Sequence, residues 1–158
     1  MTPVQKINLQ RLFNPKHVAV IGGKDAEAVT LESQRIGYRG KLWPVNPRRK
    51  MMGGHDCFPT VEDLPEAPDA VFLAIPREPA IETADQLRQM GVGGIVCYTA
   101  GFKELGLQGE VAEDALVNAC GEMALVGPNC YGILNYLDRV ALWPFAQGGN
   151  CPGLDRKS

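Results

Sequence analysis

The sequence predicts an α/β fold built on a doubly wound parallel sheet, and three observations support this prediction. Short apolar runs rich in β-branched residues recur along the chain, and most of them stop at glycine or proline. Longer stretches that mix polar and apolar residues separate these runs. The length of 158 residues suits one domain with a packed core. Strands that alternate with helices imply right-handed crossovers, which place helices on both faces of a parallel sheet.

Five buried strands are expected, at Val18–Ile21, Lys41–Val45, Ala70–Ile75, Gly94–Thr99 and Ala124–Val126. The first strand is followed by Gly22 and Gly23 and the third by Pro76, which are residues that interrupt regular structure. The second strand contains Pro44, which lacks a backbone donor. This strand is therefore expected at an edge of the sheet or in an irregular position.

Three helices are expected between these strands, at Asp25 to about Ile36, Glu78 to Met90 and Gly109 to Cys120. Gly37 and Gly91 follow the first two helices, where a glycine commonly forms the cap. The segment from Met51 to Leu64 holds turn residues and one helical turn at Val61 to Leu64. The alternation of strand and helix predicts a Rossmann-type domain.

The charge and the cysteines exclude several classes of function. Sixteen basic and eighteen acidic side chains give a formal charge of −2, so no global field would attract nucleic acid or an anionic membrane. Apolar runs such as Ala70–Ile75 fall far short of the ~20 residues that cross a bilayer, and no signal pattern opens the chain. A cytoplasmic location is therefore expected. The five cysteines include no C-x-x-C pair, and His55 with Cys57 is too small a set for a metal site.

In a doubly wound sheet the ligand lies outside the carboxyl ends of the strands, so the residues that follow each strand are the candidates. Gly22, Gly23 and Lys24 follow the first strand, where two glycines let the backbone approach a phosphate at the start of a helix. The dinucleotide fingerprint G-x-G-x-x-G is absent. A phosphate loop and a plain tight turn therefore remain alternatives.

A basic turn follows the second strand. An NAD-binding fold places Asp or Glu near this position, to bond the ribose hydroxyls. This chain instead has Asn46, Pro47 and then Arg48, Arg49 and Lys50. Three successive cations suit a ribose that carries a phosphate, as in coenzyme A or NADP. The alternative is a solvated basic loop.

The other strand ends supply no catalytic set. Cys130 has no histidine near it in the sequence, and a buried structural thiol is the expected interpretation. Glu104 and Glu110 are unpaired in the sequence and are interpreted as solvated carboxylates at helix starts.

Five strings at the strand ends match one family in order and spacing. They are Val18 to Gly23, Val45-Asn46-Pro47, Ala74-Ile75-Pro76, Ala100-Gly101-Phe102-Lys103-Glu104 and Gly127-Pro128-Asn129-Cys130. From Leu12 to Gly149 the chain resembles the CoA-binding domain of NDP-forming acyl-CoA synthetases. The same domain occurs in the alpha subunit of succinyl-CoA synthetase and in some protein acetyltransferases. The last two strings are specific, whereas the first string alone is common among nucleotide-binding folds.

The resemblance implies that coenzyme A lies along the strand ends. Its diphosphate would lie near Gly22, Gly23 and Lys24, and its ribose phosphate near Arg49 with Arg48 as a substitute. Adenine or pantetheine would contact Ile75, Pro76, Tyr98, Thr99 and Ala100, and Asn129 would border the reactive end. The family usually has a small or hydroxyl residue at the position of Lys24, with another glycine soon after it, and this chain departs from that pattern.

The resemblance also implies that this chain does not catalyse acyl-CoA formation alone. In full-length relatives the phosphorylated histidine and the nucleotide-grasp region lie beyond the position of Gly149. We therefore expect a CoA-binding domain over residues 1–149, a polar tail over residues 150–158, and a partner ligase or ATP-grasp chain. Two alternatives remain open: an NADP-binding domain of the oxidoreductase type, and a degenerate regulatory or interaction domain.

Overall fold

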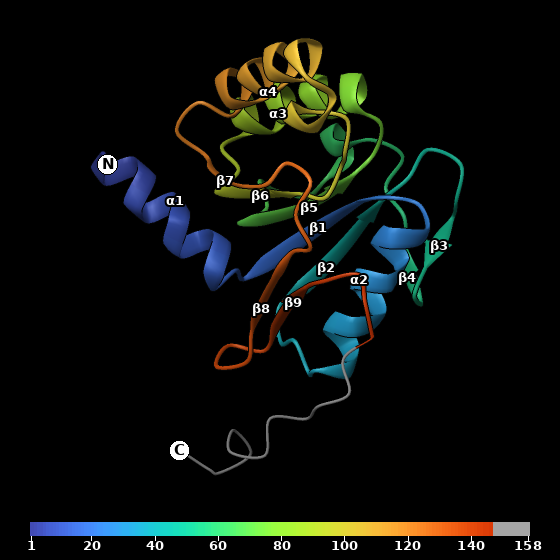
Figure 1. The fold of residues 1–158 in the computed structure, drawn as a ribbon. Coiled ribbons are helices and arrows are strands. Elements are labelled where there is room, and N and C mark those ends of the chain that lie inside the picture. Colours follow the sequence, from blue (N-terminus) through green and yellow to red (C-terminus); the bar gives the residue numbers. More distant parts are fainter. Residues whose placement is uncertain (147–158) are drawn as a thin grey trace.

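The computed structural model describes residues 1–146, and the expected tail of residues 150–158 lies outside them. A parallel sheet forms the centre of the described part (Figure 1), with strand order β2-β1-β5-β6-β7. Its strands are β1 (His17–Gly22), β2 (Lys41–Val45), β5 (Ala70–Ala74), β6 (Gly94–Cys97) and β7 (Ala124–Val126). All five predicted strands are therefore confirmed, and β2 lies at an edge as Pro44 indicated.

Helices cover both faces of the sheet, which confirms the doubly wound α/β fold. Helix α2 (Lys24–Arg35) lies on one face, and helices α3 (Arg77–Met90) and α4 (Leu107–Cys120) pack together on the other (Figure 1). Alternate residues of β1 serve the two faces. Val18 and Val20 join one buried cluster with residues of α2, whereas Ala19 and Ile21 join a second cluster with residues of α3 and α4.

Two strands end earlier than predicted. Strand β5 stops at Ala74 rather than Ile75, and β6 stops at Cys97 rather than Thr99. The residues released from these strands become loop at the carboxyl edge of the sheet. This difference matters because loop residues at that edge are free to turn toward a ligand.

The sequence did not predict one helix, two hairpins and the 3-10 helix η2 (Lys103–Leu105). Helix α1 (Pro3–Phe13) precedes the sheet, and the short hairpin of β3 (Met51–Met52) and β4 (His55–Asp56) follows β2. A second hairpin of β8 (Ile133–Asn135) and β9 (Val140–Leu142) lies beside α2 (Figure 1). The predicted helical turn at residues 61–64 is the 3-10 helix η1 (Val61–Asp63).

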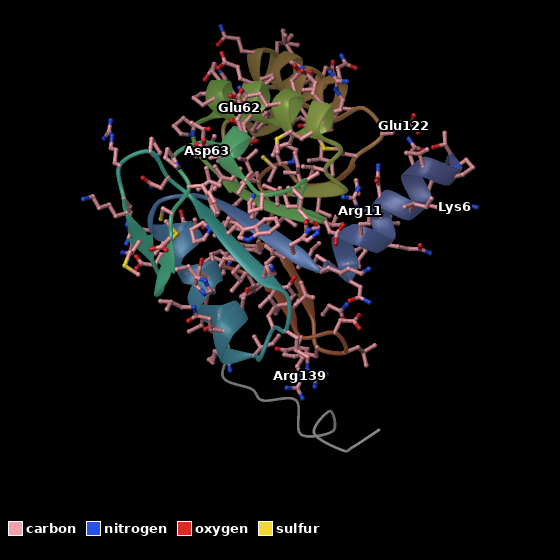
Figure 2. All side chains as sticks on the ribbon, turned by 180° about the vertical axis from the view of Figure 1, so that it is seen from behind. Lys6, Arg11, Glu62, Asp63, Glu122 and Arg139 are labelled. Carbon is pink, nitrogen blue, oxygen red and sulfur yellow. The ribbon has the colours of Figure 1, made fainter. Side chains whose placement is uncertain are left out.

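Polar contacts attach α1 to the sheet. The Arg11 guanidinium donates to the Asp69 carboxylate over 2.7 Å at the start of β5. The Asn8 amide donates to the backbone carbonyl of Glu122 over 3.0 Å, and the Thr2 hydroxyl donates to the Glu122 carboxylate over 2.7 Å. Figure 2 shows Glu122 beside the first half of α1 and Arg11 near its second half. These contacts fix α1 at the end of the sheet opposite to the predicted site.

The strand order places the expected ligand crevice. Strand β1 lies between β2, which follows it in sequence, and β5, which comes later, so the order reverses at β1. In open α/β sheets this switch point marks the binding crevice. No helix within residues 1–146 is long and apolar enough to span a bilayer.

Candidate functional site

A cavity of about 630 Å³ opens at the carboxyl edge of the sheet. Six of the predicted site residues line it, namely Ile75, Pro76, Tyr98, Thr99, Ala100 and Asn129. They come from the loops that follow β5, β6 and β7, which are separate in the sequence and adjacent in the sheet. Ala74 and Asp25 complete the side of the cavity next to the switch point, and Cys130 and Tyr131 also contribute to its wall.

Hydrogen bonds connect these three loops in series. The Thr99 hydroxyl donates to the Ile75 carbonyl over 2.6 Å, which joins the β6 loop to the β5 loop. The Asn129 backbone N–H donates to the Thr99 carbonyl over 3.0 Å, which joins the β7 loop to the β6 loop. The cavity wall is therefore built before any ligand arrives, as pre-formed small-molecule sites usually are.

The two glycines of the turn after β1 have different surroundings, since Gly22 is tightly packed and Gly23 faces open space. Gly22 has a φ of +146°, and a Cβ added there would lie 2.6 Å from the Ala74 carbonyl oxygen, so no larger residue fits between the strands. Gly23 is the N-cap of α2, it has no side-chain cap, and a Cβ there would meet nothing within 4 Å. The first N–H groups of α2 have no intrahelical acceptor, which suits an anion.

Acidic residues in the first turn of α2 oppose that anion. Asp25 lies in the first turn and lines the cavity, and Glu27 follows it. Lys24 is exposed at the first position of the helix. The helix dipole stabilises a negative charge at this helix start, whether a side chain or a bound anion supplies it. The two carboxylates therefore compete with a bound anion for this position, whereas Lys24 would attract the anion.

Asn46 holds the basic turn against the glycine turn. Its amide donates to the Gly22 carbonyl over 2.8 Å, and its Oδ1 accepts the backbone N–H groups of Arg48 and Arg49 over 2.9 and 3.0 Å. The Arg49 guanidinium is 2.9 Å from the Glu27 carboxylate of α2, and Arg48 is exposed. The predicted cations thus lie beside the helix start, with one of them already paired to an acid.

The structure divides the predicted site residues into two groups. Six line the cavity, whereas Gly22, Gly23, Lys24, Arg48 and Arg49 lie next to it at the switch point and outside its wall. Sequence reasoning missed four wall residues, namely Asp25, Ala74, Cys130 and Tyr131. Asp25 and Tyr131 adjoin the Gly-Gly-Lys and G-P-N-C strings, Cys130 ends the second of these strings, and Ala74 lies in a predicted strand just before Ile75.

Cys130 lies in the cavity wall, but it is not an activated nucleophile. Its thiol donates to the Cys97 carbonyl over 3.4 Å, and burial raises its pKa. His17 begins β1, at the opposite edge of the sheet from the cavity. Within residues 1–146 no group of three or more His, Cys, Asp or Glu side chains is arranged to hold a metal ion.

The string from Ala100 to Glu104 forms a turn below the cavity. Phe102 is fully buried in the core. The Glu104 carboxylate accepts the Gly101 N–H over 2.5 Å, and this bond lowers the pKa of that carboxyl. The Arg77 guanidinium donates to the Gly101 carbonyl over 2.8 Å. Glu104 is therefore a turn-forming residue here.

The family model for the CoA binding domain matches residues 16–136. The chain belongs to this family. The matched residues include β1 to β7, the cavity wall and both turns at the switch point. The resemblance found in the sequence is thereby confirmed, and the domain is related to ADP-forming acyl-CoA synthetases.

Among curated relatives, a trans-feruloyl-CoA synthase from an unknown prokaryotic organism is 43% identical over 141 residues, which are 85% of this chain and 20% of that protein. The alpha subunit of ADP-forming acetate–CoA ligase II from Pyrococcus furiosus is 32% identical over 139 residues, which are 80% of this chain and 29% of that subunit.

A solved structure shows the same fold. The apo form of a dinucleotide-forming acetyl-coenzyme A synthetase from Ca. Korarchaeum cryptofilum superimposes with a TM-score of 0.80 at 31% identity, over 85% of this chain and 31% of that one. The CoA-binding domain described here thus spans between a fifth and a third of the length of these three proteins.

Proposed function

We propose that this chain binds coenzyme A across the carboxyl edge of its sheet. The observation that carries the proposal is the cavity of about 630 Å³, whose wall is built from three strand-end loops and adjoins an uncapped helix start and a basic turn. The diphosphate would lie at Gly22, Gly23 and Lys24, and the ribose phosphate at Arg48 and Arg49. The rest of the coenzyme would contact Ile75, Pro76, Tyr98, Thr99, Ala100 and Asn129.

The ribose phosphate has to compete with Glu27 for Arg49. The side chains of Arg49 and Glu27 are 37% and 35% exposed, and exposed ion pairs contribute only about 0.2–1 kcal/mol. A phosphate group forms charge-assisted hydrogen bonds that contribute roughly 1.5–3 kcal/mol. The phosphate is therefore the stronger partner, and Glu27 would yield Arg49 to it.

We also propose that the chain acts as one part of a larger assembly. The P. furiosus relative is named as an alpha subunit, and all three compared proteins are longer than this chain. A phosphorylated histidine and a nucleotide-grasp region would come from a partner chain or from further sequence. The CoA-binding domain would comprise residues 1–149, the tail residues 150–158, and the site of action would be the cytoplasm.

Calorimetric titration of the chain with CoA, dephospho-CoA and NADP tests the binding proposal. CoA should bind about ten- to a hundredfold tighter than dephospho-CoA, because charge-assisted bonds to the ribose phosphate are lost in the latter. Equal affinities for both would remove the basic turn from the site.

The same titration decides between the two alternatives. Tighter binding of NADP than of CoA would favour an NADP-binding domain, which the basic turn also suits. Binding of none of the three would favour a degenerate regulatory or interaction domain, for which the carboxylates of Asp25 and Glu27 at the helix start are the supporting observation.

A further inference from the structure

Four aromatic side chains form a connected cluster at one end of the cavity, and we call Tyr98, Tyr131, Trp143 and Phe145 the aromatic cluster. The Phe145 ring centroid lies 6.3 Å from that of Tyr98, 5.8 Å from Tyr131 and 5.7 Å from Trp143, and Tyr131 and Trp143 are 6.2 Å apart. Tyr98 and Tyr131 also line the cavity. Two rings of the cluster thus face the site, and Trp143 and Phe145 pack behind or beside them from the segment that follows β9.

Two rings of the aromatic cluster are exposed to solvent, unlike the rings of a buried core cluster. Tyr131 is 69% exposed and Phe145 is 40% exposed. The rings of these contacts are inclined by 44° to 74°, the tilted and edge-to-face arrangements that aromatic pairs prefer. Another aromatic ring placed against Tyr131 and Phe145 would bury apolar surface and gain contacts of the same kind.

Trp143 adds an unsatisfied donor to this cluster. Its indole Nε1 is buried and has no hydrogen-bond acceptor among the described residues. Buried tryptophan N–H groups usually find a partner, since leaving one unpaired costs about 1–3 kcal/mol. The indole therefore has to find its acceptor outside the described residues.

The order of the strands indicates which end of the coenzyme meets the aromatic cluster. The basic turn follows β2 at one edge of the sheet, and the loop of Tyr98 follows β6 in the other half of the sheet. Three strand spacings of ~4.8 Å separate β2 from β6, or about 14 Å. A linear coenzyme with its ribose phosphate at the basic turn would bring its thiol end to the aromatic cluster.

The charge of the cavity wall disfavours an acyl group that carries a carboxylate. Asp25 is the one charged side chain among the wall residues that the structure describes. Its carboxylate is close enough to Tyr98 to add to the rise that burial causes in the pKa of that phenol. An acyl group that carries its own carboxylate would find repulsion and no cation in this wall.

We infer that the aromatic cluster holds a neutral aromatic acyl group attached to the coenzyme as a thioester. The inference rests on the proposed CoA-binding function and names the acyl class that this site takes. An aromatic ring stacks on Tyr131 and Phe145 and should improve affinity about tenfold over a short aliphatic acyl group.

The test is a calorimetric titration of the full chain with CoA and four thioesters: acetyl-CoA, benzoyl-CoA, cyclohexanecarbonyl-CoA and succinyl-CoA. Benzoyl-CoA should bind about tenfold tighter than acetyl-CoA. Cyclohexanecarbonyl-CoA matches the ring in size but has no π-system, and it should fall between them. Succinyl-CoA should bind more weakly than acetyl-CoA because the wall offers its carboxylate no cation and already carries the charge of Asp25.

Four variants connect this preference to the aromatic cluster. Tyr131→Ala and Phe145→Ala should reduce the ratio of acetyl-CoA to benzoyl-CoA dissociation constants to below about threefold. Tyr131→Phe keeps the ring and should keep the ratio. Leu137→Ala is the matched control, because Leu137 is 79% exposed in the turn between β8 and β9, away from the cavity wall. Thermal unfolding of each variant checks its fold.

The outcomes separate this inference from the proposed function. Equal affinities for benzoyl-CoA and acetyl-CoA, with both bound, would overturn the aromatic acyl site and leave CoA binding intact. Benzoyl-CoA binding no tighter than cyclohexanecarbonyl-CoA would overturn recognition of the aromatic ring. Failure to bind CoA and every thioester would overturn the proposed function and the inference with it.

Discussion

Glu27 and Arg49 control the charge that a ribose phosphate would meet beside α2. Their side chains are 2.9 Å apart and about a third exposed, so water screens the pair. Asn46 fixes the backbone of the basic turn through two accepted hydrogen bonds. The direction of approach of Arg49 is therefore set by Asn46, whereas its availability depends on Glu27.

Replacing Glu27 by Gln removes the competing charge and keeps the size of the side chain. CoA should bind about two- to fivefold tighter, since a screened ion pair of roughly 0.4–1 kcal/mol no longer has to be broken. Dephospho-CoA should change less. Glu32→Gln is the control, because this substitution removes an equal charge from the same helix. Glu32 pairs with Arg35 and not with the basic turn. Weaker CoA binding by Glu27→Gln in low-salt calorimetry would contradict the competition.

Lys24 is exposed at the first position of α2, where its charge can meet a diphosphate. Lys24→Ser should weaken CoA binding and flatten its dependence on salt, because one screened attraction is lost. Titrations at low and high salt measure both effects. Stronger binding by the Ser variant would show that the lysine obstructs the loop, and unchanged affinity at both salts would place Lys24 outside the site.

Helix α1 illustrates how single elements of this fold depend on long-range polar contacts. Its start has a capping box between Thr2 and Gln5, with a proline at the first helical position. Its second half is held by Arg11, which donates to Asp69. Asp69 is buried and also accepts the Lys16 N–H over 2.9 Å, so one carboxylate joins α1, β1 and β5.

Asp69→Asn should destabilise the domain in a pH-dependent way. Burial raises the pKa of Asp69, but hydrogen bonds from Arg11 and Lys16 and the nearby His17 outweigh burial and lower it. The stabilisation is therefore present above the unfolded-state pKa of about 3.9 and is lost as the pH falls through the lower folded-state pKa.

Urea denaturation at pH 7 should show a loss of roughly 1.5–3 kcal/mol in the free energy of unfolding for Asp69→Asn. The gap between the wild type and the variant should shrink as the pH falls below about 4. Asp114→Asn on the exposed side of α4 is the control, with an expected change within about 0.5 kcal/mol. A gap that persists unchanged at low pH would show that charge is not the cause.

At the scale of the whole molecule, the described part of the chain has the binding edge of a CoA-binding domain. The cavity wall, the glycine turn and the basic turn all lie at one edge of the sheet. The Cys130 thiol has a raised pKa and donates to a backbone carbonyl, so it is not poised as a nucleophile.

The chain alone should form no acyl-CoA from acid, CoA and ATP. Neither histidine lies in the wall of the cavity, because His17 begins β1 at the opposite edge of the sheet and His55 lies in the hairpin of β3 and β4. Product formation is measured with saturating substrates and purified protein. Turnover that co-purifies with the chain and survives rigorous purification would contradict this prediction.

Local patterns in the sequence were sufficient for much of the fold. Five apolar runs predicted five strands, and Pro44 predicted that one of them lies at an edge, because a missing backbone donor is a property of one residue. Helix α1 was not predicted although Thr2, Pro3 and Gln5 form a start signal, because Asn8 and Leu12 are its only buried residues and its apolar periodicity is weak. The three-residue strands β8 and β9 are too short for any periodicity to reveal.

The sequence by itself determined which residues follow the buried strands, and therefore most of the cavity wall, because in a parallel sheet all carboxyl ends meet at one edge. The tertiary structure decided which of those residues face each other. The pairing of Arg49 with Glu27 and the contact of Tyr98 with Phe145 join residues 22 and 47 positions apart. Such contacts depend on strand order and on the path of the chain after β9, and no local spacing encodes either.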